Sequence, residues 1–341
     1  MRGPTAKQLI ILTVLSVAAI LIGTAAGSVS VPLSDTVETV WALILGRPVP
    51  QLASASIIAY VRFPRVLNVY LVGAALSLSG AAMQGLLKNP LADGSTLGVS
   101  AGASLGAALS LAFGAQLSFF PAAGTAGMAM LFAFLSLMIV LFLSYRLDHA
   151  LTTNTIILTG VIYSMFMNSL ISLVVTFAGE HAKSILFWTM GSLSGTTYKN
   201  AATVLAFLLV CGTVILLSSN ELNAFAVGED NARTIGVPVV RVRRRILVCV
   251  SALVGVTVAV GGTIGFVGLV VPHAVRRITG PNHRILLPVT LFVGGIFLVL
   301  ADLLGRVLLS PLELPIGVIT SFTGSISFIF LLFRQRRSGK C

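Results

Sequence analysis

The sequence predicts an all-α membrane protein with about ten transmembrane helices. Hydrophobic residues make up 56% of the 341 residues and charged residues only 9%, whereas a typical soluble domain has about 25% charged residues. The mean hydropathy is +1.02. The apolar residues also form long runs separated by short polar stretches. We therefore expect residues 1–341 to form a single transmembrane domain.

Eight runs have about 20 predominantly apolar residues, the length that a helix needs to cross the hydrocarbon core. They cover residues 8–28, 66–87, 122–144, 152–177, 199–218, 246–263, 285–304 and 314–333. Two shorter runs, 95–113 and 264–278, are rich in glycine and small side chains. They are expected to cross only inside a bundle, where small residues let helices pack closely. The first run is longer than the apolar region of a secretory signal, so we expect an uncleaved helix.

The basic residues predict the orientation of the chain. With the N-terminus in the cytoplasm, six of the 22 Lys and Arg residues fall in outer loops: Arg47, Arg62, Arg65, Lys183, Lys199 and Arg306. The others, including Arg2 and Lys340 near the ends, then fall in cytoplasmic loops, as the positive-inside rule requires. An even number of spans places both termini in the cytoplasm. The net charge of +12 thus needs no nucleic-acid partner.

Several kinds of chemistry are missing from the sequence. The ten Asp and Glu residues are expected in or beside loops, whereas gradient-driven carriers usually keep an ionisable group within the membrane. The phosphate-binding pattern G-x-x-x-x-G-K-[ST] does not occur, so any ATP must be bound by another subunit. The four His and three Cys lack metal-ligand spacing, and no cofactor or metal site is expected. A gradient-driven carrier and a membrane-embedded enzyme are thus weak alternatives.

The segment 219–245 is the most polar part of the chain and is expected on the cytoplasmic side. Two short helices are predicted there, with a break at Gly228 and an end at Gly236 and Pro238. Their apolar faces are expected to be formed by Leu222, Phe225 and Ala226 in the first helix and by Ala232 and Ile235 in the second. Two surface helices at a membrane exit suggest a docking platform, and an ordinary loop between spans is the alternative.

Six stretches together resemble the FecCD-type permease family, the membrane subunits of ABC importers for iron–siderophores, haem and cobalamin. They are Arg62-Phe-Pro-Arg65 with Leu71-Val-Gly-Ala-Ala-Leu-Ser-Leu-Ser-Gly80; residues 84–102, containing Asn89-Pro-Leu-Ala-Asp93 and Leu97-Gly-Val-Ser-Ala-Gly102; Trp188-Thr-Met-Gly-Ser-Leu-Ser-Gly195; residues 226–237; Gly265-Phe-Val-Gly-Leu-Val-Val-Pro-His-Ala-Val-Arg276; and Ala301-Asp-Leu-Leu-Gly-Arg306 with Glu313-Leu-Pro-Ile-Gly-Val-Ile-Thr320. They occur in the family's order over nearly the whole chain. Two departures are Gly94, where the family usually has proline, and Gly324-Ser-Ile-Ser-Phe328 in place of Gly-Ala-Pro-x-Phe.

The resemblance implies the bundle of a type II ABC importer permease, a transport subunit without enzymatic activity of its own. It also implies a homodimer, or a heterodimer with a related permease, that works with two ABC ATPase subunits and an extracytoplasmic substrate-binding protein. The expected location is the lipid bilayer of a bacterial or archaeal cell (inner) membrane. The expected cargo is an iron–siderophore, with haem and cobalamin as alternatives, and the expected cavity wall consists mostly of small, apolar and hydroxyl residues.

Three sets of site residues follow from matching the family's motifs. Arg62 and Arg306, with Arg65 nearby, match outer arginines that dock the binding protein; snorkelling to lipid headgroups is the alternative. The cytoplasmic gate is implied at Asn89, Leu91, Thr152 and Thr153, with helix capping or turn formation as the alternative role of Asn89. Coupling to the ATPase is implied at Asn223, Ala226, Gly228, Glu229, Arg233 and Gly236. Glu229 and Arg233 are four residues apart and are expected to pair on one helix face.

Overall fold

The chain is almost entirely helical in the computed structural model, which describes residues 3–27, 31–114, 124–149 and 151–337. Residues 28, 122 and 123 of the predicted spans lie outside the described residues, as do Arg2 and Lys340 of the predicted cytoplasmic charges. No β-strand is formed in the four described ranges, and one isolated bridge joins Leu309 to Leu312.

The predicted ten-helix arrangement is confirmed. The helices at the predicted spans are α1 (Ala6–Ala25), α4 (Phe63–Leu87), α5 (Val99–Phe113), α6 (Gly124–Leu147), α7 (Thr153–Phe177), α9 (Tyr198–Phe207) with its continuation η4 (Leu208–Gly212) and α10 (Thr213–Leu217), α13 (Val239–Gly261), α14 (Val267–Thr279), α15 (His283–Val307) and α16 (Ile316–Arg337). Seven helical segments within the described residues are long and apolar enough to cross a membrane. Of the other three helices, α5 and α14 are short, as expected, with 15 and 13 residues, and α16 has 22.

Eight further segments connect or extend these helices. They are α2 (Leu33–Ile44), α3 (Ala55–Ile57), the π-helical turn η1 (Ile58–Arg62), the 3-10 turns η2 (Gly94–Leu97) and η3 (Gly179–His181), α8 (Ala182–Thr189), α11 (Ser219–Val227) and α12 (Glu229–Thr234). No helix was predicted between the runs 8–28 and 66–87, so α2 was missed. Its buried residues Thr39 and Val40 follow the buried Thr36 by three and four positions, as on one face of a helix.

Two spans also begin earlier than predicted. Residues 55–87 form one continuous helix of 33 residues that includes α3, η1 and α4. It runs through Pro64 because the wider π-helical turn immediately before the proline accommodates the missing N–H. Helix α13 begins at Val239, directly after Pro238. The arginines of 241–245 therefore lie in the first turns of a spanning helix and not in the predicted loop.

Helix α4 is the central helix of the bundle. In the most apolar 18 residues of the 55–87 helix, to which α4 belongs, 83% are buried inside the protein, against 22% in the corresponding part of α1. Small residues permit this packing: a Cβ added at Gly73 would lie 2.4 Å from the Gly294 carbonyl oxygen of α15, and one at Gly80 would lie 1.8 Å from the Gly268 carbonyl oxygen of α14. In each of these pairs the two helix backbones can approach this closely only because both residues are glycines.

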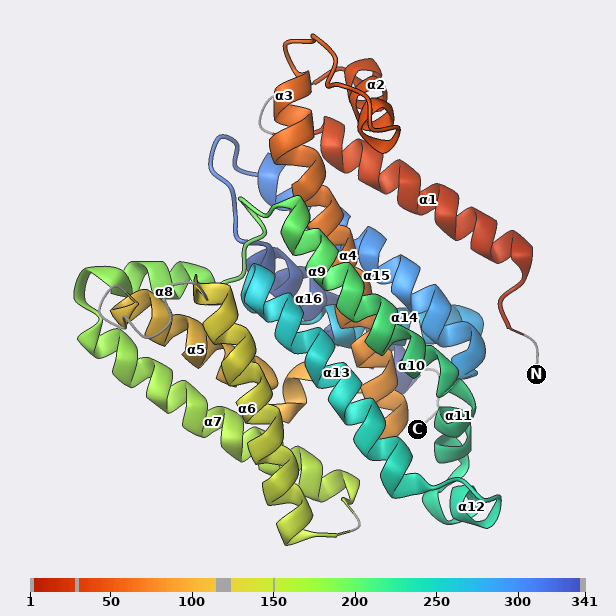
Figure 1. Cartoon of the computed structure of the whole chain (residues 1–341). Helices are drawn as coiled ribbons and strands as arrows, with labels where there is room; N and C mark the ends of the chain where they lie inside the picture. The colour runs from red at the N-terminus through yellow and green to blue at the C-terminus, as the bar shows by residue number, and fades with distance from the viewer. Residues whose placement is uncertain (1–2, 28–30, 115–123, 150, 338–341) are drawn as a thin grey trace.

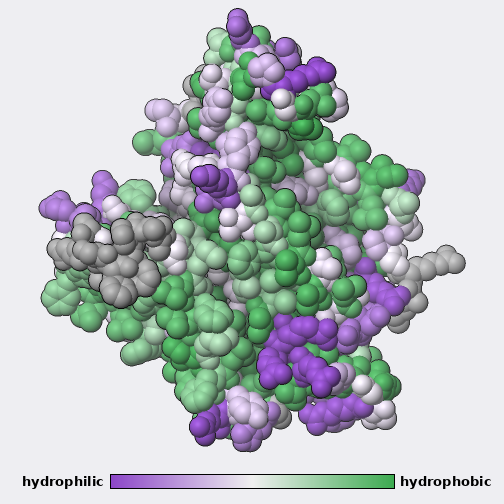
Figure 2. Space-filling view, viewed as in Figure 1, coloured by the Kyte–Doolittle hydropathy of each residue, from purple (hydrophilic) through white to green (hydrophobic). Residues whose placement is uncertain are grey.

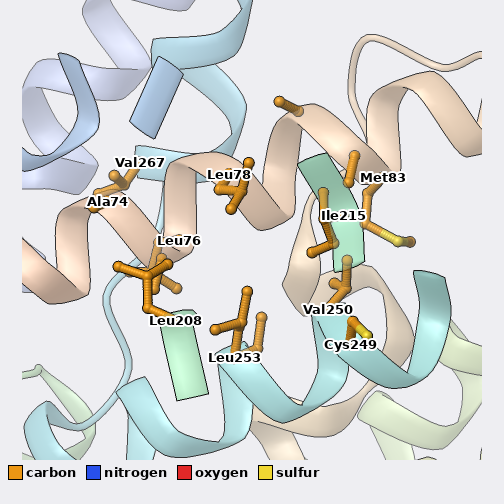
Figure 3. Packing of buried hydrophobic residues seen from close by; sticks show 14 of the residues in the cluster. Ala74, Leu76, Leu78, Met83, Leu208, Ile215, Cys249, Val250, Leu253 and Val267 are labelled. Carbon is orange, nitrogen blue, oxygen red and sulfur yellow. The ribbon is translucent and has the colours of Figure 1, made fainter. Parts of the chain in front are cut away.

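Figure 1 shows the arrangement around α4. Helix α1 lies on one side against α15, and α5–α8 form a group on the opposite side. Figure 3 shows apolar side chains of α4, α13, α14 and the η4–α10 segment gathered into one core. In Figure 2 hydrophobic side chains cover the middle of the visible face, and hydrophilic ones gather at the two ends, near α2–α3 and near α11, α12 and the start of α13. This is the pattern of a bilayer-spanning bundle.

Candidate functional site

A cavity of about 820 Å³ lies between α5, α7 and α16. Its wall is rich in hydroxyl groups, from Ser95, Ser100, Ser104, Ser164, Ser172, Thr189, Thr263 and Ser321. The remaining lining residues are neutral: Ala101, Asn168, Ile171, Met190, Gly265, Gly317 and Val318. The wall can thus form hydrogen bonds with a polar molecule but presents no fixed charge to it. This composition agrees with the expected wall of small, apolar and hydroxyl residues.

Two of the motif stretches, 188–195 and 313–320, meet residues 261–263 beside this cavity. The Thr263 hydroxyl donates to the Thr189 carbonyl, and the Ser192 N–H donates to the Gly261 carbonyl at 2.8 Å. A Cβ at Gly317 would lie 2.2 Å from the Met190 carbonyl oxygen. The segments around residues 190, 263 and 317 therefore lie in close contact, and the glycine at 317 permits it.

The polar turn before α5 positions Ser95 and Ser100 at the cavity. The Asp93 carboxylate caps η2 by accepting from the N–H groups of Ser95 and Thr96 at 2.9 and 3.2 Å. Gly98 then has φ +72 and starts α5, a left-handed conformation that glycine adopts readily. The helix consequently begins deep in the bundle.

The predicted gate residues lie in two turns at helix boundaries. The Asn89 side chain accepts from the Leu91 N–H at 2.9 Å, which is the local turn bond considered as its alternative role, and Leu91 is 50% exposed. Thr152 is the N-cap residue of α7 and Thr153 its first residue. The Thr152 N–H donates to the Asp148 carboxylate at 2.8 Å. The gating role of all four residues stays a prediction.

The predicted pair of surface helices is present as α11 and α12. Gly228 separates them with φ +140, and Gly236, with φ +86, follows α12. Of the residues expected on their apolar faces, Leu222, Phe225 and Ala232 are buried, whereas Ala226 and Ile235 are exposed. Val227 and Ile235 are 73% and 71% exposed. The pair therefore presents apolar side chains outward, as a docking platform would, and Arg233 is exposed beside them.

One prediction within the platform is wrong. Glu229 does not pair with Arg233: its carboxylate pairs with Arg243 of α13. Asn223 is also engaged inside the protein, because its side-chain oxygen lies 2.8 Å from the His283 backbone nitrogen and 2.9 Å from His283 Nδ1. Arg243 and His283 were not singled out in the sequence. Arg243 is one of four arginines in 241–245, and only its complete burial distinguishes it.

The fold brings together the three arginines that were predicted in outer loops, but all three lie in helices. Arg62 and Arg65 lie in the 55–87 helix and Arg306 in α15, and Arg62 and Arg306 are only 7% and 3% exposed. Arg62 donates to the Ala25 carbonyl at 2.7 Å, and Arg306 to the Gly23 and Ala26 carbonyls at 2.7 and 2.8 Å. The last carbonyls of a helix have no partners within it and attract cations. These two arginines therefore cap α1.

Two carboxylates complete this cluster. Asp302 lies between Arg65 Nη2 and Arg306 Nε, both 2.9 Å from its oxygens. Glu313 accepts from Arg65 Nη1 at 2.8 Å. We call Arg62, Arg65, Asp302, Arg306 and Glu313 the outer ion cluster. Its arginines are occupied by partners within the chain, and the docking role predicted for them stays a prediction.

Comparison with known proteins identifies the family. A family model for the FecCD transport family matches residues 12–334. The chain belongs to the FecCD transport family. It is 40% identical to YvrB of Bacillus subtilis, named an uncharacterized ABC transporter permease protein, over 94% of this chain and 92% of YvrB. It is 38% identical to the vitamin B12 import permease BtuC of Klebsiella pneumoniae, over 82% of this chain and 83% of BtuC.

The fold is also shared with a solved ABC transporter structure. The chain matches an inward-facing ABC transporter assigned to the metal-chelate type, with a TM-score of 0.83 and 32% identity over 97% of this chain and 100% of that one. As a FecCD protein, the chain is thus a multi-pass integral membrane protein and the permease subunit of an ABC transporter.

Proposed function

We propose that this FecCD permease imports a bulky metal chelate by ATP-driven alternating access, with the neutral cavity as part of the path. The charge-free, hydroxyl-rich wall is the observation that carries the proposal. Such a wall holds a large polar molecule weakly, so the molecule can leave as readily as it enters. The absence of the P-loop pattern in the sequence supports a separate ATPase subunit.

The assembly we propose has two permease copies, or this chain and a related permease, two ABC ATPases and one extracytoplasmic binding protein. Residues 1–341 form a single transmembrane domain with both termini and α11–α12 in the cytoplasm. The ATPase docks on α11–α12, where Ala226, Val227 and Ile235 are exposed. The binding protein docks at the outer ion cluster. Direct pairing with Arg62 or Arg306 then requires release of the α1 carbonyls that these side chains hold.

For the cargo, an iron–siderophore and a corrinoid are the two candidate classes. The relatives named for vitamin B12 or cobalamin import favour a corrinoid. The metal-chelate type of the matched transporter accommodates either class. Specificity in both cases resides in the binding protein, because the neutral wall offers no charge that would select one chelate.

Reconstitution tests the proposal directly. The permease, its ATPase and its binding protein are placed in liposomes, and uptake of a radiolabelled ferric siderophore and of cobalamin is measured with and without ATP on the ATPase side. Uptake of one of them is expected only with ATP, the ATPase and the binding protein together. ATP-independent uptake driven by an imposed ion gradient would favour the gradient-driven carrier instead.

A charge placed in the cavity wall is expected to affect uptake. Asn168→Asp adds a carboxylate with almost no change in shape, and it should lower the uptake of an anionic chelate about tenfold, because like charges in a partly desolvated site repel. Asn168→Ser, which keeps the wall neutral, is the matched control and should transport normally. Equal uptake by the two variants would show that the cargo does not pass Asn168.

A further inference from the structure

Two buried polar contacts connect the surface helices α11 and α12 to the two turns that carry the predicted gate residues. The first contact is centred on Arg243 of α13, whose side chain is 0% exposed. One guanidinium nitrogen donates to the Leu151 carbonyl at 2.5 Å, and another pairs with Glu229, the first residue of α12. Arg243 thus joins α12 to the residue immediately before Thr152.

The Leu151 backbone has a conformation that needs such support. Leu151 is 3% exposed and has φ +52, in the left-handed region that a residue with a branched side chain rarely adopts. Conformations of this kind persist where surrounding contacts fix them. The hydrogen bond from Arg243 is one such contact, and it sets the position of the carbonyl at the entrance to α7.

The second contact connects α11 with the end of α4. The Asn223 side-chain oxygen accepts from the His283 backbone N–H and lies 2.9 Å from His283 Nδ1. The Asn223 NH2 group donates to Asn282 Oδ1 at 2.9 Å. The His283 ring in turn lies against Gly85 of α4, where a Cβ would be 2.4 Å from Nε2. Gly85 precedes Asn89 by four residues, which is about one helical turn. Movement of α11 would therefore reach the gate turn through the His283 ring.

The chemistry of these contacts distinguishes them from the surrounding core. Apolar packing is non-directional, so apolar surfaces can slide past each other. Hydrogen bonds and ion pairs fix distance and angle, and inside a protein breaking one leaves a costly unpaired group. Segments joined in this way are more easily moved together than separated.

We propose that these contacts are two mechanical connectors, one for each surface helix. Arg243 links α12 to the Thr152–Thr153 turn, and the Asn223–His283 pair links α11 to the Asn89–Leu91 turn. Arg243, Asn223 and His283 are therefore positioning residues that transmit ATPase movement and touch no cargo. The inference rests on the proposed function, since it assumes that α11–α12 receive force from an ATPase.

The test uses the reconstituted complex and measures three quantities for each variant: ATPase copurified, ATP hydrolysed and cargo taken up. Arg243→Met and Asn223→Ala are expected to retain the ATPase and to hydrolyse ATP, while the ATP consumed per cargo molecule rises about tenfold, within the range typical of coupling between sites. Arg146→Met removes an exposed arginine at the end of α6 and is the control, with an unchanged ratio.

The ratio of ATP hydrolysed to cargo taken up distinguishes a connecting role of these residues from a purely structural one. If uptake and hydrolysis fall together at constant ratio, or if Arg243→Met transports at the normal ratio, the proposal is overturned. If Arg243→Met does not accumulate, Glu229→Ala, which removes the partner of Arg243 on α12, takes its place, and an unchanged ratio in that variant would overturn the proposal equally. Failure of the unmodified complex to show ATP-dependent uptake would instead contradict the proposed function.

Discussion

Gly80→Ala is expected to destabilise the protein strongly. The added methyl group would lie 1.8 Å from the Gly268 carbonyl oxygen and 2.5 Å from Gly268 Cα. These are backbone atoms, so α4 and α14 would have to separate along their contact. Overpacking of a core costs about 1–3 kcal/mol when side chains can adjust, and a backbone shift places this variant at or above the upper end of that range.

The measurement is thermal unfolding of the detergent-purified protein, followed by size-exclusion chromatography. Gly212→Ala is the matched control, because its added methyl group would contact the ends of the Leu208 and Leu78 side chains at 3.3 Å. Those side chains can rotate, so this variant should differ from the unmodified protein by less than about 1 kcal/mol. Similar melting temperatures for the two variants would show that the α4–α14 contact is not rigid.

Asp302→Asn is expected to destabilise strongly the end of the bundle that holds the outer ion cluster. The Asp302 side chain is 2% exposed, and its carboxylate faces Arg65 and Arg306, whose side chains are 11% and 4% exposed. Removing one partner of a buried ion pair costs about 3–5 kcal/mol, because the remaining charge stays buried without compensation. The free energy of unfolding should fall by that amount.

Glu313→Gln removes the other carboxylate of the outer ion cluster and is the control. The Glu313 side chain is 37% exposed, and exposed ion pairs contribute about 0–1 kcal/mol. Chemical denaturation of both variants in the same detergent gives the comparison. Equal destabilisation by the two single variants would contradict the buried-pair account.

The sequence predicted the helices best where apolar runs are long. The positions of α6, α7 and α15 follow from runs of about 20 predominantly apolar residues, and the shortness of α5 and α14 from the shorter runs rich in small residues. Helix α2 was missed because the search for spans requires length, whereas a 12-residue helix is revealed only by its 3.6-residue period. The start of α13 was placed late because arginines interrupt the hydropathy without interrupting the helix.

For the site, motif matching located the segments but not the partners of their side chains. The break at Gly228 could be predicted, because a glycine between two polar helical stretches favours a turn. The pairing of Glu229 with Arg243, 14 residues away, depends on how α12 folds back onto α13. Likewise, the contact of Arg306 with the end of α1 joins residues 280 apart in the chain. No local pattern encodes such distances.

The neutral wall of the cavity has a consequence for how the substrate range of the proposed importer can evolve. A passage without fixed charge neither attracts nor repels a cargo by its net charge, so a new chelate requires no rebuilding of the membrane-embedded path. Exchange of the binding protein alone would then give the transporter a different substrate. Selection for new substrates should accordingly change residues in the pocket of the binding protein and leave the serines of α5 and α7 unchanged.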